Sequence, residues 1–217
     1  MIDTNIMNKY ENFFNEEHSA SYEILEGGGC VMFSAPHSVS QTRNGIVKSA
    51  EPQTGTLVRL LNHYMSIPVI YKTANKGDDP NFDQSSPYKD DLASFILSNG
   101  IKVLFDIHLL SAKRNTYIAI GTGKGKNCNN RLIVDAVKEE LGNICSGEIQ
   151  VDGLFSSSGK NTVSSSIATK CKIQCIQIEI NSRLVYPQYS ECCIERVFEA
   201  LANIARRSEN VFKGEIL

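Results

Sequence analysis

Short apolar runs alternate along this chain with longer segments in which apolar residues recur every three or four positions. A run of four to eight residues with a period of two, or with no polar break, is typical of a strand. On this basis we predict strands at Ser21–Glu26, Cys30–Ala35, Val69–Thr73, Lys102–His108, Thr116–Gly121 and Lys172–Ile180. The three glycines Gly27–Gly29 between the first two runs indicate a hairpin.

The longer segments predict helices. Leu57, Leu60 and Leu61 share one side of the first, for which Thr54 is a plausible cap, and Gly100 ends the second. The predicted helices are Thr56–Met65, Tyr88–Ser98, Cys128–Leu141 and Tyr189–Arg206. Strands that alternate with helices favour a largely parallel sheet with crossover helices. No linker or repeat divides the chain, so we expect one α/β domain over residues 1–217.

Composition narrows the classes of partner. The net charge is −2 and the longest basic cluster is a pair such as Arg206–Arg207, which argues against nucleic acid as a partner. No apolar run approaches the roughly 20 residues that span a bilayer, so we expect no membrane segment. The N-terminal segment has neither a basic start nor an apolar run, as a secretory signal would. We therefore expect a cytoplasmic protein.

The seven cysteines do not predict a metal site. An odd number of cysteines without an export signal favours reduced thiols. Cys171 and Cys175 are expected on one strand, and Cys192 and Cys193 on one helix, and neither pair has CxxC spacing. We interpret them as small core residues. The GTGKG stretch after Ile120 lacks the spacing of a phosphate-binding loop and is discounted.

Two of the four histidines stand at predicted strand ends, where α/β enzymes keep their sites. His37 follows the strand CVMFSA and Pro36, and His108 closes the strand KVLFDIH. A loop histidine bonded to a carbonyl is the structural alternative for either one. His18, in a polar segment, and His63, in a helix, are expected on the surface or in packing.

Acidic residues near these histidines complete a candidate site. Two imidazoles and one carboxylate are a common catalytic zinc set, and Glu51 is the candidate carboxylate, although it also suits the first turn of a helix. Asp106 shares a strand face with His108 and could bond its ring N–H or pair with a lysine. Glu179 ends an apolar strand, where it suits a general base or a buried ion pair with Arg183.

Four segments together resemble the N-formylglutamate amidohydrolase family. They are SAPHS at Ser34–Ser38, the glutamate of SAEPQTG, DIH at Asp106–His108 and IEINSR at Ile178–Arg183. The order His, carboxylate, His and strand-borne Glu is also similar to that of the wider zinc carboxypeptidase and aspartoacylase group. The resemblance spans roughly residues 22–205, including the strand YIAIGTGKGKNC.

The resemblance implies a three-layer α/β/α sandwich with a mixed, largely parallel sheet of the phosphorylase/hydrolase type. It implies one Zn²⁺ on His37, Glu51 and His108, with Glu179 as the base. The substrate implied is a small N-acyl amino acid, whose carboxylate calls for an arginine, with Arg183 the first choice and Arg43 the second. The alternatives are a zinc carboxypeptidase or amidase on peptide-like substrates, and a non-catalytic relative that binds metal or a small ligand.

Overall fold

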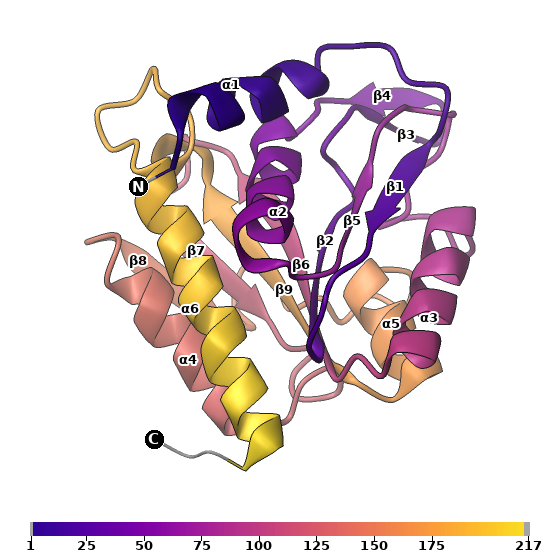
Figure 1. The fold of residues 1–217 in the computed structure, drawn as a ribbon, viewed down its shortest axis with the longest axis vertical. Coiled ribbons are helices and arrows are strands. Elements are labelled where there is room, and N and C mark those ends of the chain that lie inside the picture. The colour runs from indigo at the N-terminus through magenta and orange to yellow at the C-terminus, as the bar shows by residue number, and fades with distance from the viewer. Residues whose placement is uncertain (1, 215–217) are drawn as a thin grey trace.

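The computed structural model describes residues 2–214, and a seven-stranded mixed sheet forms its middle layer (Figure 1). The pairs β1–β5 and β9–β7 are antiparallel, and the four other neighbouring pairs are parallel. In sheet order the strands are β1 (Tyr22–Leu25), β5 (Val69–Lys72), β2 (Val31–Ala35), β6 (Val103–Leu110), β9 (Gln174–Asn181), β7 (Thr116–Gly121) and β8 (Glu148–Val151).

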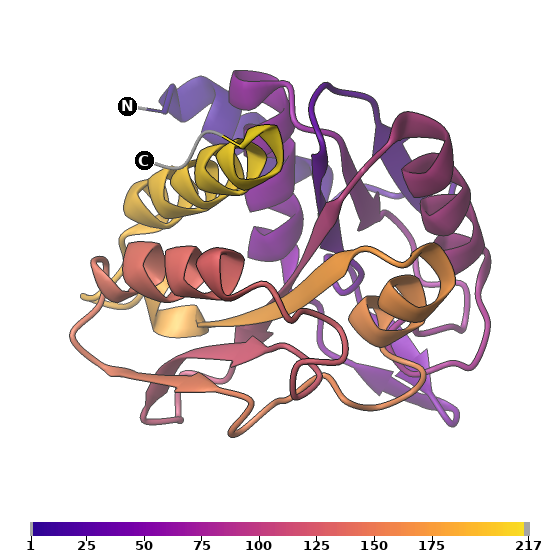
Figure 2. The ribbon, with the colours of Figure 1, turned by 90° about the horizontal axis from the view of Figure 1, so that it is seen from below.

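Helices cover both faces of the sheet, as Figure 2 shows. One apolar core joins α2 (Pro52–Met65), α4 (Arg131–Gly142) and α6 (Ile194–Lys213) to one face of the sheet. A second core joins α3 (Pro87–Asn99) and α5 (Val163–Cys171) to the other face. The helix α1 (Thr4–Phe13) packs on α2 through Tyr10 and Leu60. The predicted three-layer α/β/α sandwich with a mixed, largely parallel sheet is therefore confirmed.

The predicted hairpin between the first two strands is wrong. β1 pairs with β5 in antiparallel register, Leu25 opposite Val69, and β5 then separates β1 from β2. All five residues of β2 are buried, as in a central strand, whereas those of β1 are only half-buried, as at an edge. The glycine segment instead passes close to the end of α2, where a Cβ at Gly27 would meet the Ser66 carbonyl.

Several local predictions also change. α2 begins at Pro52, so Thr54 lies inside its first turn and Glu51 holds the cap position. Cys171 ends α5, whereas Cys175 lies in β9, and Cys192 and Cys193 precede α6 rather than lie on it. Elements that the pattern did not predict are α1, α5, β8, the short hairpin of β3 (Gln41–Arg43) and β4 (Ile46–Lys48), and the 3₁₀ turn Ser182–Leu184.

The parallel strands at the centre determine where the candidate residues meet. β2, β6 and β9 run in one direction side by side, so their carboxyl ends share one edge of the sheet. β6 and β9 are buried on both faces, which explains their nearly continuous apolar sequences. His37 follows β2, while His108 and Glu179 are register partners near the ends of β6 and β9.

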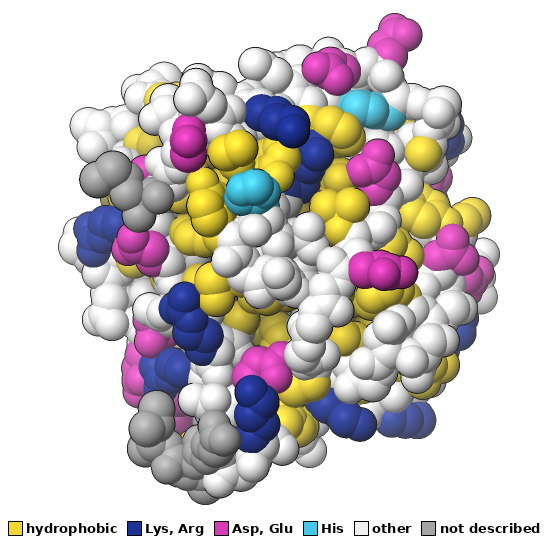
Figure 3. All heavy atoms as spheres, in the orientation of Figure 1, with side chains coloured by type: hydrophobic (Ala, Val, Ile, Leu, Met, Phe, Trp, Pro, Cys, Tyr) yellow, Lys and Arg dark blue, Asp and Glu magenta, His cyan; other side chains and the backbone are white. Residues whose placement is uncertain are grey.

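The surface carries charges of both signs. Lys and Arg side chains are interspersed with Asp and Glu over the face seen in Figure 3. None of the helices among residues 2–214 combines the length and the apolar composition needed to cross a membrane.

Candidate metal centre and active site

The imidazoles of His37 and His108 face each other at the carboxyl edge of the sheet. Their Nδ1 atoms are 3.1 Å apart, although the residues are 71 positions apart in the chain. Both side chains are almost fully buried, with 4% of His37 and 1% of His108 exposed. The sheet thus brings together the two histidines that the sequence singled out.

A buried carboxylate holds the other nitrogen of each ring. His37 Nε2 lies 3.0 Å from Asp79 Oδ1, and His108 Nε2 lies 3.0 Å from Asp106 Oδ2. An ionised carboxylate only accepts hydrogen bonds, so each Nε2 carries the proton and donates. In the neutral rings each Nδ1 is therefore unprotonated, and the lone pairs of the two Nδ1 atoms point into the space between the rings.

Glu51 completes this cluster and is tied to both histidine segments. Its backbone N–H donates to the His37 carbonyl at 2.8 Å, and its Oε2 accepts from the Leu109 N–H at 2.9 Å. Oε1 lies 3.5 Å from His37 Nδ1, and Oε2 lies 3.8 Å from His108 Nδ1. Its side chain makes no capping bond to α2, because the carboxylate points to the histidines instead.

The cluster has the chemistry of a cation site. Its ligand atoms, two imidazole nitrogens and a carboxylate oxygen, all lie within 4.8 Å of one another. Tetrahedral zinc with bonds of about 2.05 Å separates two ligand nitrogens by about 3.3 Å. The observed 3.1 Å separation of the Nδ1 atoms is close to that value. The residues present therefore fit a single zinc ion held by His37, Glu51 and His108.

The pKa shifts in the cluster show that its surroundings favour a positive charge. Burial lowers the pKa of His37, but hydrogen bonds to Asp79 and Glu51 outweigh it and raise that pKa to about 10. Burial raises the pKa of Glu51, but the neighbouring His37 and His108 outweigh it and lower that pKa. The surrounding carboxylates thus stabilise a cation among these side chains, whether it is a proton or a metal ion.

Glu179 lies beside this cluster and lines the same cavity of about 530 Å³ as His37, Glu51 and His108. Its Oε1 accepts a 2.7 Å hydrogen bond from Gln177 Nε2. Burial raises its pKa, which suits a group that must take up a proton. None of the ion pairs found within residues 2–214 joins Glu179 to Arg183, the alternative partner.

The two candidate arginines occupy different places. Arg183 donates from Nε to the Ala112 carbonyl at 2.7 Å and does not line the cavity. Arg43, in the β3–β4 hairpin, lines the cavity with its guanidinium 5.6 Å from the Phe82 ring. Its Nε donates to Asp79 Oδ2, so one carboxylate bridges Arg43 and His37.

Sequence reasoning missed Asp79 and Gln177. Asp79 is fully buried in the loop after β5. In the sequence it could not be told apart from Asp78 and Asp83, which are carboxylates in the same loop. The available signal was general, since a metal-ligating histidine needs a carboxylate or carbonyl on its other nitrogen. Gln177 lies two positions before Glu179 on the same strand face, the same spacing that pointed to Asp106 beneath His108.

The remaining histidines and the glycine-rich loop have structural surroundings. The His18 ring lies against Phe13 and bonds its carbonyl at 2.7 Å, and the His63 ring packs edge-on against Tyr10 and Tyr64. In the loop after β7, the Gly123 N–H donates to Ser156 and the Gly125 N–H to Thr122. These two glycine amides are therefore occupied by other groups of the protein and are not free to bind a phosphate.

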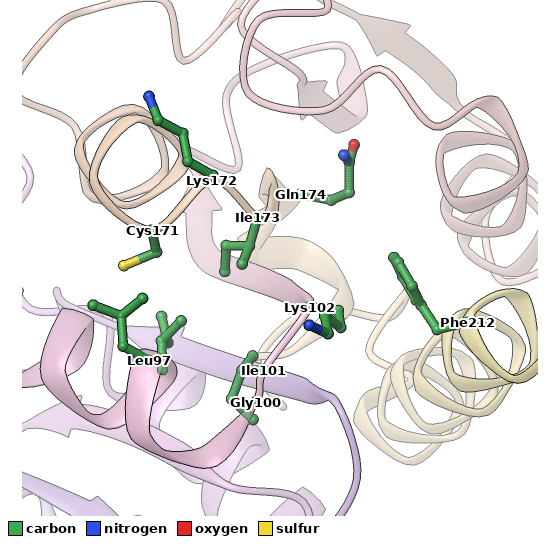
Figure 4. A pocket seen from close by; sticks show the side chains of 10 residues that line it. Leu97, Gly100, Ile101, Lys102, Cys171, Lys172, Ile173, Gln174 and Phe212 are labelled. Carbon is green, nitrogen blue, oxygen red and sulfur yellow. The ribbon is translucent and has the colours of Figure 1, made fainter.

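A second, smaller hollow of about 210 Å³ lies at the opposite end of β6 and β9. Figure 4 shows Lys102, Cys171, Lys172 and Phe212 around it. Its lining contains no histidine or carboxylate among the described residues, and its only thiol, Cys171, has a pKa raised by burial. The candidate chemistry therefore belongs to the first cavity.

Known structures share this fold. N-formylglutamate amidohydrolase from Ralstonia eutropha JMP134 superposes with a TM-score of 0.66 at 13% identity, over 91% of this chain and 100% of that one. A bacteriophage poly-γ-glutamate hydrolase gives 0.57 at 13% identity, over 93% and 94% of the two chains. A metallo-carboxypeptidase from Pseudomonas aeruginosa gives 0.53 at 10% identity, over 98% of this chain and 68% of that one.

No family model and no curated protein matches the sequence. The predicted resemblance to these amide hydrolases is confirmed at the level of the fold. Within that fold, this chain carries the His37–Glu51–His108 cluster, a group of side chains that could hold a metal ion.

Proposed function

We propose that this protein is a zinc-dependent hydrolase that cleaves the amide bond of an N-acyl amino acid with an acidic side chain, similar to N-formylglutamate. One observation carries the proposal. Two buried imidazoles, in their neutral form, and a carboxylate direct acceptor atoms at one point, beside a second carboxylate, Glu179, in the same cavity.

The groups divide the work of amide hydrolysis among them. A zinc ion held by His37, Glu51 and His108 would supply Lewis acidity for the amide carbonyl and lower the pKa of a water. Glu179 Oε1 is engaged by Gln177, so Oε2 is the oxygen that takes a proton from the attacking water. The same oxygen then delivers that proton to the leaving nitrogen, which otherwise departs poorly as an amide anion.

Arg43 supports an acidic substrate. Its Nε donates to Asp79 and its planar group lies near Phe82, and none of the hydrogen bonds within residues 2–214 engages its two terminal amino groups. A preorganised guanidinium binds a carboxylate by two parallel hydrogen bonds. Two proteins that share the fold are named for glutamate amides, N-formylglutamate and poly-γ-glutamate. We therefore assign Arg43 to the substrate carboxylate.

Paired variants test the proposal. Glu179→Gln should keep one zinc per chain and lose roughly 100- to 10,000-fold in kcat, because the proton acceptor is gone. His108→Ala should lose the zinc itself. The measurements are metal content by elemental analysis and hydrolysis of N-formyl, N-acetyl and N-succinyl glutamate. Normal turnover by Glu179→Gln would contradict the assigned base.

A second candidate is hydrolysis of peptide-like amides by the same residues. The cavity of about 530 Å³ is roomy for a single N-acyl amino acid, and a metallo-carboxypeptidase shares the fold. Comparing kcat/KM for N-acyl glutamates with that for short acidic peptides separates the two. Bound zinc with no turnover on either set would instead indicate a non-catalytic relative.

A further inference from the structure

The central strands β6 and β9 carry the same arrangement twice. On β6, Asp106 lies two residues before His108 and bonds its Nε2 at 3.0 Å. On β9, Gln177 lies two residues before Glu179 and bonds its Oε1 at 2.7 Å. The strands pair in register, Asp106 opposite Gln177 and His108 opposite Glu179, so the four side chains form two parallel rows. In each row the residue that comes first in the strand makes a hydrogen bond to the second: Asp106 to His108, and Gln177 to Glu179.

The amide of Gln177 has only one possible orientation in this row. An ionised carboxylate offers no proton, so the group that faces Glu179 Oε1 must be the donor Nε2. A neutral donor stabilises the carboxylate without adding negative charge next to Glu51 and Asp106. A second carboxylate at this position would instead compete with Glu179 for a proton.

Gln177 keeps this orientation although its other polar atom gains nothing. Its Oε1 is buried and has no hydrogen-bond partner among residues 2–214, and only 4% of the residue is exposed. A buried acceptor without a partner disfavours the folded state. An apolar side chain of the same length would avoid that penalty, so what the glutamine adds at this position is its hydrogen bond to Glu179.

We propose that Gln177 is a positioning residue for the hydrolytic step: it fixes Oε1 of Glu179, so that Oε2 alone is presented to the attacking water. The inference rests on the proposed function. Gln177 serves Glu179 as Asp106 serves His108, and it acts on the reaction only through that carboxylate.

The decisive variant is Gln177→Met, which keeps the length of the side chain and removes the donor. We expect kcat to fall about 10- to 100-fold with KM within twofold of wild type, unchanged zinc content and an equal or higher melting temperature. A merely structural role predicts a lower melting temperature with unchanged kcat. Either unchanged kcat, or a loss of zinc that accounts for the lower kcat, would overturn the proposal.

Gln53→Met is the matched control. Gln53 is also buried, donates from Nε2 to a glutamate, Glu11 of α1, at 2.9 Å, and has an Oε1 to which no group in the described part of the chain donates. It does not line the cavity, so kcat should stay at the wild-type value. If Gln177→Met does not fold, Gln177→Asn withdraws the amide by one methylene and should show the same fall in kcat, whereas wild-type kcat would refute the proposal.

A spectroscopic measurement separates this inference from the proposed function. The infrared difference between wild type and Glu179→Gln isolates the Glu179 carboxylate without any need for turnover. The antisymmetric stretch of the Glu179 carboxylate should shift in Gln177→Met, which lacks the donor, and should not shift in Gln53→Met. A shift in a protein that hydrolyses none of the substrates would refute the proposed function alone, and an unshifted band would refute the hydrogen bond.

Discussion

The two imidazoles of the metal cluster are held by carboxylates in very different surroundings. Asp79 comes from the loop after β5, where its Oδ1 accepts from His37 and from the Asn81 N–H and its Oδ2 accepts from Arg43. Asp106 lies inside β6, two residues before the ring it holds. Its Oδ2 accepts from His108, and its buried Oδ1 has no partner among residues 2–214.

The difference lies in how the negative charge is shared. Asp79 divides its charge between an imidazole, a guanidinium and a backbone amide, so His37 receives only part of it. Among residues 2–214, Asp106 has His108 as its one hydrogen-bond partner, so that ring receives nearly the whole effect of the charge. A carboxylate behind a metal-bound histidine raises the basicity of the ring. His108 should therefore be the stronger ligand, and His37 the one whose strength depends on Arg43.

Removing the metal should have the largest effect. The acceptor atoms of His37, Glu51 and His108 converge on one point, where a bound zinc ion would balance the carboxylate charge, so zinc should stabilise the folded chain. At free zinc about 1,000 times the dissociation constant, the free energy of unfolding should rise by about 4 kcal/mol. Thermal melts with and without a chelator measure it. Equal melting temperatures would show that the cluster does not hold zinc.

Asp106→Asn should give the next largest effect. Asparagine keeps an acceptor for the His108 Nε2–H but removes the unshared charge, so zinc affinity should fall about 100-fold, or about 2.7 kcal/mol. The metal-free protein should keep its melting temperature within a few degrees, because the Oδ1 that is replaced accepts no hydrogen bond from residues 2–214. Competition titration with a chromophoric chelator gives the affinity, and less than a threefold change would contradict the charge argument.

Much of the fold follows from local pattern. The buried strands β6 and β9 were predictable from nearly continuous apolar sequence, and α3 from Gly100, which has a φ of 67° after its last turn. Nothing in the local sequence of the edge strand β1 indicates which strand it pairs with. Its neighbour β5 follows 44 positions later in sequence, counted from Leu25 to Val69, so the three glycines suggested a nearer and incorrect pairing.

The candidate site divides along the same line. His37, His108 and Glu179 were visible because each stands near the end of an apolar strand, where polar residues are informative. Asp79 could not be singled out, because the sequence does not show which acidic residue of its loop will lie beside His37 in the folded chain. The role of Arg43 likewise depends on the β3–β4 hairpin, two strands of three residues each within a polar segment.

Asp79→Asn should affect zinc less than Asp106→Asn does. Because Arg43 already neutralises part of the Asp79 charge, we expect about a tenfold loss of affinity, or about 1.4 kcal/mol. Unlike Asp106→Asn, this variant should also lower the melting temperature, since it leaves the guanidinium of Arg43 without its charged partner. The same chelator competition measures the affinity. A loss larger than that of Asp106→Asn would reverse the proposed ranking of the two histidines.

Arg43→Met should have the smallest effect on zinc, and in the opposite direction. Without the guanidinium, Asp79 gives its whole charge to His37, so zinc affinity should rise about two- to threefold. KM for acidic N-acyl amino acids should rise at least tenfold, because the substrate carboxylate loses its partner.

The control is Arg114→Met. Arg114 lies 5.5 Å from the Phe155 ring, much as Arg43 lies 5.6 Å from Phe82, but none of the ion pairs within residues 2–214 joins it to a carboxylate that also holds a histidine. Zinc affinity should be unchanged in this variant. If Arg43→Met weakens zinc binding, Arg43 is needed to keep Asp79 in contact with His37. The difference between Asp79 and Asp106 would then lie in how each carboxylate is positioned and not in how its charge is shared.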